Sequence, residues 1–325
     1  MSEVLLEVKN VKKYFAVSDG PFFSKKKKHV KAVDDVSFQI KRGETVGIVG
    51  ESGCGKSTLA RLINRLITPT SGAVRFKGRA LTGLSPKEIR TERQHIQMIF
   101  QNPYASLDPR KKIEALIMEP LVIHNIGTKK ERRKKVDEML EIVGLSAYHG
   151  DRYPHEFSGG QRQRINIARA LVLNPELIIC DEPVSALDVS IQAQVINLLK
   201  DLQTEFHLTY LFIAHDLDVV RFISDRIMVM YLGKVVETGT CEEVYRTPQH
   251  PYTRALLSSV PLKSPFEERE RIFLQGDVPS PIDPPSGCHF HERCPFAVEQ
   301  CKTAAPVLSE YIAEHQVSCH LAGQI

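Results

Sequence analysis

The chain lacks any apolar run close to the roughly 20 residues that cross a bilayer as a helix. It also lacks a secretory signal, because its first residues, 1–7, include acids where a signal carries bases and contain no long apolar stretch. These two absences predict a protein that stays in the cytoplasm and has no membrane span.

A strong charge of one sign is missing too. The net charge of +4 is small for 325 residues and does not by itself indicate a nucleic-acid partner. Two basic runs, at 25–28 and 129–135, are expected to be solvated faces, with anionic lipid headgroups as an alternative contact for the first. The apolar fraction of 42% and the charged fraction of 25% are average for soluble globular proteins. The length fits one large domain with an appendage, or two modest domains.

Short apolar runs at 45–49, 177–180 and 210–214 have the pattern of buried strands, and each ends in polar residues. Helical patterns follow at 59–63 and at 187–206, where apolar residues recur at spacings of three and four. Strands that alternate with helices predict an α/β fold with a mainly parallel sheet, whose ligands bind at the carboxyl ends of the strands. Residues from about 105 to 165 read as an inserted helical subdomain. Residues 227–237 read as a hairpin turning at Gly233 and Lys234.

A phosphate-binding P-loop lies between the first predicted strand and its helix. Its glycines let backbone N–H groups turn inward toward an anion, and the helix amino terminus adds partial positive charge. Lys56 is expected to reach the β and γ phosphates, and Ser57 to ligate Mg²⁺. The alternative, a tight turn with a surface lysine, does not need this strand and helix context. The predicted ATP-binding residues here are Gly50, Glu51, Ser52, Gly53, Cys54, Gly55, Lys56, Ser57 and Thr58.

Two adjacent carboxylates end the second predicted strand. Asp181 suits a partner of Mg²⁺, and Glu182 suits the base that polarises the attacking water. An acidic pair in this position often caps the following helix instead. The presence of the P-loop favours the catalytic interpretation, because the phosphates that it binds and the Mg²⁺ and water that these carboxylates contact belong to one nucleotide site.

The pentapeptide from Phe157 to Gln161 indicates a family. Taken alone it reads as a helix cap at Ser158, but the sequence here resembles the ABC ATPase family, in which Ser-Gly-Gly-Gln is diagnostic. The other family motifs follow in order: Gln101 resembles the Q-loop, residues 185–188 the D-loop, and His215 the switch histidine. Phe15 resembles the aromatic residue that stacks on adenine, with Tyr14 as the alternative.

The resemblance covers residues 1–240 as an ABC cassette and implies a mechanism. Two cassettes would close head to tail on two ATP molecules, and hydrolysis would release the closed pair. Glu182 and His215 would be catalytic, and Gln101 would bind ATP and relay the cycle to a membrane subunit. The implied Mg²⁺ ligands are Ser57, Gln101 and Asp181, and the residues implied to act across the dimer are Ser158, Gly159, Gly160, Gln161 and Asp188.

A narrower resemblance covers nearly the whole chain. Residues 100–110, 181–190 and 250–253 look like those of the oligopeptide, dipeptide and nickel importers, most like the dipeptide-transport ATPases of the second type. It implies a translocase ATPase at the cytoplasmic face of the membrane, with a paralogous ATPase likelier than a second copy as partner, two membrane permease subunits and an extracytoplasmic substrate-binding protein. Peptide is the expected substrate and nickel the alternative. The insertion near 20–31 departs from the family.

Two other classes compete with the transporter. ABC ATPases that act on nucleic acid or ribosomes carry two cassettes, a long coiled coil or a zinc module, and none is visible in this sequence. A nucleic-acid partner is therefore not expected. An interaction protein with an inactive P-loop would have lost Lys56, Glu182 or His215, and all three are present.

Four of the seven cysteines lie within about the last forty residues, in an extension from 241 to 325 that prolines predict to be loop-rich. They lack the Cys-x2-Cys knuckles of most zinc modules. The peptide-importer resemblance implies a structural [4Fe-4S] cluster, with Zn²⁺ and metal-free thiols as alternatives. The implied ligands are Cys288, Cys294, Cys301 and Cys319, and the histidines that keep a mixed site open are His289, His291, His315 and His320.

Overall fold

The computed structural model describes residues 3–18, 27–102, 105–260 and 271–325. Most of the insertion near 20–31, and Lys25 and Lys26 of the first basic run, lie outside these residues. The chain divides into two compact units. Unit 1 comprises 1–3, 41–45 and 83–214, and unit 2 comprises 4–40, 46–82 and 215–325.

Unit 1 contains three parallel strands in the order β8 (Thr209–Ile213), β7 (Leu177–Asp181) and β6 (Ile96–Ile99). All residues of β7 and β8 are buried, as expected for parallel strands that are covered on both faces. The two strands predicted here are confirmed. The register places Asp181 beside Ile213, so these strand ends lie together.

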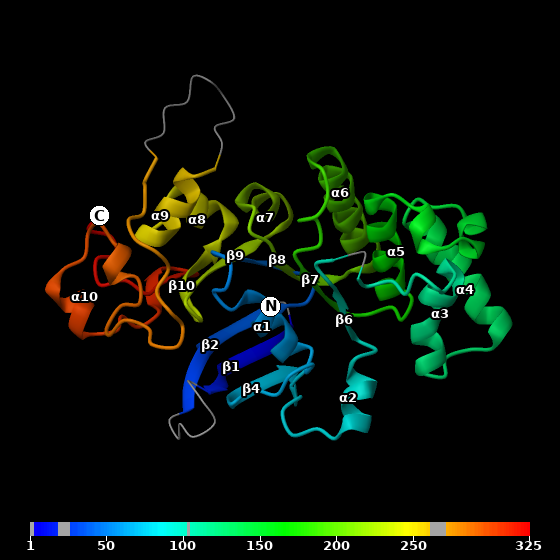
Figure 1. Ribbon diagram of the computed structural model, residues 1–325, viewed down its shortest axis with the longest axis horizontal. Helices are drawn as coiled ribbons and strands as arrows, with labels where there is room; N and C mark the ends of the chain where they lie inside the picture. Colours follow the sequence, from blue (N-terminus) through cyan, green and yellow to red (C-terminus); the bar gives the residue numbers. More distant parts are fainter. Residues whose placement is uncertain (1–2, 19–26, 103–104, 261–270) are drawn as a thin grey trace. The chain divides into compact units, whose positions relative to one another are not determined.

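Helices make up the rest of unit 1. They are α2 (Pro86–Glu92), α3 (Ile113–Ile123), α4 (Lys129–Ile142), α5 (Gly159–Leu171) and α6 (Val189–Phe206). Figure 1 shows α3, α4 and α5 packed together, and short 3₁₀ turns at Ala147–Asp151 and Pro154–Glu156 connect α4 to α5. The basic run 129–135 opens α4 with no buried residue, whereas Val136, Met139 and Leu140 farther along the helix are buried.

Unit 2 contains an antiparallel sheet in the order β2 (Lys27–Lys41), β1 (Val4–Ser18), β4 (Ser71–Phe76) and β5 (Arg79–Ala80). It also holds β3 (Thr45–Val49), which pairs in parallel with β9 (Arg226–Tyr231). Strand β10 (Lys234–Thr240) turns back on β9 through Leu232 and Gly233, both at positive φ, which a two-residue hairpin of this kind requires. The predicted hairpin is therefore present, but its turn lies one residue earlier than expected.

The extension is more regular than its prolines predicted. It forms α8 (Cys241–Arg246), α9 (Pro251–Ser258), α10 (Glu299–Thr303), β11 (Ser309–Ile312) and β12 (His315–Val317). Strand β12 pairs with β10, and α8 packs on β9 and β10 (Figure 1). The His315 imidazole and the Glu237 carboxylate, both fully buried, are 2.8 Å apart across this pairing. A polar contact thus joins β12 to the core, which hydrophobic periodicity does not reveal.

Two further helices of unit 2 are α1 (Lys56–Ile63) and α7 (Leu217–Ile223). Across the described ranges, no helix combines the length and apolar character that a membrane span needs.

Candidate nucleotide site

The phosphate-binding loop connects the wholly buried β3 to α1 in unit 2. Two glycines have close neighbours that leave no room for a side chain. A Cβ on Gly50 would lie 2.2 Å from the Met230 carbonyl oxygen, and one on Gly55 would lie 2.1 Å from that of Ala32. Both glycines have positive φ, so larger residues would be strained as well as blocked. The loop is therefore packed closely against β9, through Met230, and β2, through Ala32.

Lys56 lies within this loop and is only 4% exposed. Its Nζ donates hydrogen bonds to the carbonyl oxygens of Gly50, at 2.7 Å, and Glu51, at 3.0 Å. The ammonium group is thus fixed at the start of α1, where a helix terminus also favours an anion. The adjacent Cys54 thiol is buried, which raises its pKa and keeps it protonated. The geometry suits the binding of a phosphate group.

Glu51 forms hydrogen bonds with Tyr252 and Arg293, neither of which was predicted from the sequence to be a site residue. Its backbone N–H donates to the Tyr252 hydroxyl at 2.8 Å. Its carboxylate accepts two hydrogen bonds from the Arg293 guanidinium, at 2.7 and 3.0 Å. The hydrogen bonds to Glu51 raise the pKa of Arg293 further above its usual range. Tyr252 lies in the segment 250–253, which was noted only because it resembles the peptide importers. No sequence pattern indicated Arg293.

In unit 1 the structure brings Gln101 and Glu182 together. The Gln101 Nε2 donates to the Glu182 carboxylate at 2.6 Å. Glu182 has a positive φ of 50°, uncommon for a residue with a side chain, and its N–H donates to the Ile213 carbonyl oxygen at 2.9 Å. Such conformations concentrate at functional sites. Its neighbour Asp181 is 3% exposed, and the following helix is capped by Asp188, so the simple capping interpretation does not apply to this acidic pair.

The Ser158 hydroxyl caps α5, as the pentapeptide predicts when it is taken alone. It accepts from the Gln161 N–H at 3.3 Å, while the Gln161 side chain accepts from the Ser158 N–H at 3.0 Å. A Cβ on Gly160 would lie 2.4 Å from a methyl group of Ile191 in α6. The pentapeptide 157–161 and α6 are therefore in close contact. Gly159 begins α5. Ser158 is exposed at this position.

Asp188 caps α6 by accepting from the Ile191 N–H at 3.0 Å, and this hydrogen bond is the main cause of its lowered pKa. The next residue, Val189, is 81% exposed.

The remaining predicted site residues lie in unit 2. His215 is exposed and precedes Asp216, the cap of α7. Phe15, in β1, is 39% exposed with the Lys13 ammonium 4.9 Å from its ring centre. Tyr14 instead donates its hydroxyl proton to Asp34. Phe15 is therefore better placed than Tyr14 to stack on a base.

The four cysteines implied as cluster ligands, Cys288, Cys294, Cys301 and Cys319, lie near one another. Burial and the neighbouring thiols raise the pKa of Cys288 to about 11, and Cys301 is only 6% exposed. In the part of the chain that the structure describes, however, no three His, Cys, Asp or Glu side chains are grouped to bind one metal ion. Three of the histidines of the extension have other contacts. His291 contacts the Cys288 carbonyl oxygen, His315 contacts the Glu237 carboxylate, and His320 contacts the Ala304 carbonyl oxygen. The arrangement does not fit a single zinc ion.

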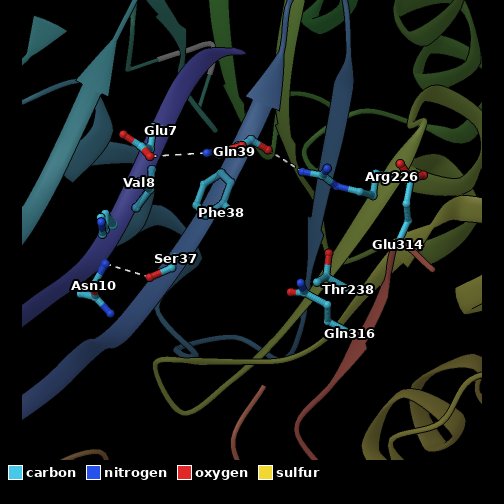
Figure 2. A pocket seen from close by; sticks show the side chains of 11 residues that line it. Glu7, Val8, Asn10, Ser37, Phe38, Gln39, Arg226, Thr238, Glu314 and Gln316 are labelled. Atoms are coloured by element: carbon cyan, nitrogen blue, oxygen red, sulfur yellow. Dashed lines mark hydrogen bonds between the residues drawn. The ribbon is translucent and has the colours of Figure 1, made fainter. Parts of the chain in front are cut away.

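An open groove of about 470 Å³ is a separate feature of unit 2. Figure 2 shows Gln39 between Glu7 and Arg226, with hydrogen bonds to both. Its other labelled residues come from β1, β2, β10, β12 and the turn before β12. No nucleotide-motif residue lines it, so it is distinct from the phosphate-binding loop.

Comparison with known proteins identifies the family. The ABC transporter family model matches residues 33–185, and the model for the C-terminal region of oligopeptide/dipeptide transporters matches residues 236–301. The oligopeptide transport ATP-binding protein AppF of Bacillus subtilis is 59% identical over 322 residues, covering 98% of each chain. OppF of Escherichia coli, with the same description, is 55% identical over 98% of this chain and 96% of its own.

The fold has solved counterparts. The dimeric post-hydrolysis structure of the ATP-binding cassette MJ0796 bound to ADP and Pi has a TM-score of 0.65 and 32% identity, and the match covers 73% of this chain and 99% of that one. The predicted α/β cassette fold is confirmed. The chain belongs to the ATP-binding proteins of ABC transporters, in the oligopeptide and dipeptide transport branch of that family.

Proposed function

We propose that this chain hydrolyses Mg-ATP to drive the uptake of di- and oligopeptides through membrane subunits that it does not itself contain. The main support is the similarity to peptide-transport ATP-binding proteins along 98% of the chain, including the extension. Nickel uptake is the alternative that the sequence resemblance also allows.

The residues of the nucleotide site have distinct roles in this proposal. Lys56 and the amides from Gly50 to Thr58 bind the phosphates, and Phe15 stacks on adenine. Ser57, Gln101 and Asp181 hold Mg²⁺, which when bound neutralises charge on the phosphates. Glu182 accepts the proton of the attacking water, and His215 assists it. The hydrogen bond from Gln101 to Glu182 supports a shared role for these two side chains.

A second ATPase subunit completes the site. That partner is a paralogue rather than an identical chain. The nucleotide that it holds is contacted by five residues of this chain, Ser158, Gly159, Gly160, Gln161 and Asp188. The exposure of Ser158 and Val189 supports a partner on this surface. Ser158→Arg should keep ATP binding by the isolated chain but lose ATPase activity in the assembled pair. Full activity in the assembled pair would contradict this role.

The chain also serves two permease subunits and an extracytoplasmic substrate-binding protein, and works as a peripheral protein at the cytoplasmic face of the membrane. Functionally it divides into a cassette at 1–240, with its helical subdomain at about 105–165, and an extension at 241–325. The match of a separate family model to residues 236–301 supports this division.

The extension binds a [4Fe-4S] cluster through Cys288, Cys294, Cys301 and Cys319. The other three thiols lie close enough to Cys288 to raise its pKa, and all four are at least partly buried, which supports this ligand set. A cluster distributes its thiolates over several metal atoms, so it does not need them grouped around one ion. Protein purified without oxygen should be brown and contain iron and sulfide. Colourless, iron-free protein would reject the cluster.

Uptake by cells tests the transport function. Deleting the gene for this chain should abolish uptake of a labelled dipeptide and leave uptake of labelled nickel unchanged. The wild-type chain should restore peptide uptake, and Glu182→Gln should not. Loss of nickel uptake with normal peptide uptake would instead select the alternative substrate.

A further inference from the structure

Arg293 connects the extension to the phosphate-binding loop. It ends the short 3₁₀ turn His291–Arg293, directly before Cys294. Its side chain is only 8% exposed, and its guanidinium makes a two-pronged contact with the Glu51 carboxylate, 242 residues earlier in the chain. This geometry fixes both groups in direction as well as distance. A segment that contains none of the nucleotide motifs thus holds the second residue of the P-loop.

A second element of the extension holds the backbone of the same residue. Tyr252, in α9, is fully buried, and its hydroxyl accepts the Glu51 N–H at 2.8 Å. The rings of Tyr252 and Tyr231 lie 5.4 and 5.2 Å from the ring of Phe290, three residues before Arg293. The Arg293 guanidinium also reaches the Tyr231 hydroxyl at 3.5 Å. This aromatic cluster joins α9 and the cysteine segment into one support behind the loop.

The contact continues to the residue expected to meet phosphate. The Glu51 carbonyl oxygen is one of two backbone acceptors for the Lys56 ammonium, at 3.0 Å. If Glu51 shifts, one of the hydrogen bonds that hold the ammonium is lost. A continuous path of hydrogen bonds therefore runs from Arg293 through Glu51 to Lys56.

We propose that Arg293 is a positioning residue for ATP binding: through Glu51 it holds the phosphate-binding loop and Lys56 in place, so that nucleotide affinity depends on the extension. This inference rests on the proposed role of the P-loop. A purely structural contact would lower stability and leave affinity unchanged.

The test measures binding of a fluorescent ATP analogue with Mg²⁺, together with thermal unfolding, on the full-length chain. Arg293→Gln should weaken binding about tenfold or more, since a hydrogen bond to a charged group is lost. Lys302→Gln is the matched control, because Lys302 forms an exposed pair with Glu299 in the same extension. That variant should bind like wild type. Wild-type affinity in Arg293→Gln with a lowered Tm would overturn the proposal.

Two more variants distinguish an effect on the position of the loop from a general loss of folding. Tyr252→Phe removes only the hydroxyl that accepts the Glu51 N–H, and should weaken binding several-fold even if Arg293→Gln fails to fold. Unchanged affinity in Tyr252→Phe would count against the support of the loop. Glu51→Gln removes the same contact from the other side, so adding Arg293→Gln to it should weaken binding no further. A further loss of affinity in the double variant would show that Arg293 does not act through Glu51. Wild-type protein that fails to bind would instead refute the proposed function itself.

Discussion

Two glutamates in the nucleotide motifs have opposite surroundings. Glu182, at the end of β7, has a strained backbone and accepts a hydrogen bond from the neutral amide of Gln101. Glu51, in the phosphate-binding loop, accepts two from the guanidinium of Arg293 and is anchored at its N–H by Tyr252. The contact with a buried cation favours a structural role for Glu51, whereas the contact with Gln101 and the unusual backbone favour the proposed catalytic role of Glu182. Two glutamates that both belong to nucleotide motifs are thus expected to have different roles.

The largest expected effect comes from removing the carboxylate that is proposed as the base. Glu182→Gln should slow ATP hydrolysis by about 10²–10⁴-fold, the usual contribution of a general base, while ATP still binds. Steady-state phosphate release and equilibrium binding measure the two effects. Glu138→Gln, in the exposed pair with Lys134 on α4, is the control and should hydrolyse normally. Normal hydrolysis by Glu182→Gln would mean that another group is the base.

The support behind Glu51 should be sensitive to acid. His250 caps α9, where its Nδ1 accepts the Tyr252 N–H at 3.1 Å, and burial lowers its pKa to about 4. The unfolded chain binds this proton near pH 6.5, so the folded state is stabilised above that pH and loses the contribution as pH falls toward 4. The full loss is about 3 kcal/mol.

Urea unfolding between pH 7 and pH 4 measures this dependence. His250→Asn keeps a capping residue but cannot titrate, so its free energy of unfolding should fall less over the same range. Identical pH profiles for the variant and wild type would assign the acid sensitivity to other groups.

Lys56→Ala should weaken Mg-ATP binding by roughly 10–100-fold, because the phosphates lose a charged hydrogen-bond donor. Isothermal titration measures the affinity. The exposed Lys134→Ala on α4 is the control and should bind normally. Tight binding by Lys56→Ala would contradict the role of the P-loop.

Removing the Glu51 carboxylate should have the smallest effect on the chemical step. Glu51→Gln should lower the free energy of unfolding by about 2 kcal/mol, since Arg293 loses its charged partner. Denaturant unfolding measures this loss. An unchanged midpoint would show that the contact contributes nothing to stability.

Much of the site was predictable because its determinants are local. The glycines of the P-loop and the buried strands 177–181 and 209–213 are contiguous patterns, and parallel pairing alone places strand ends together. The contact between Gln101 and Glu182 follows from the pairing of β6 with β7.

The parts that sequence missed depend on distant partners. Arg293 contacts Glu51 across 242 positions, and β12 is a three-residue strand joined to β10 by a buried His315–Glu237 contact. Neither has a periodic signal. The hairpin turn was displaced because Leu232 adopts positive φ, which an aliphatic residue rarely does.

The most direct measurement compares kcat and KM for ATP in Glu182→Gln and Glu51→Gln, each assembled with the same partner subunits. Glu182→Gln is expected to lose kcat with little change in binding, and Glu51→Gln is expected to keep kcat at saturating ATP with a raised KM. Loss of kcat in Glu51→Gln together with a normal kcat in Glu182→Gln would contradict the division of roles between the two glutamates.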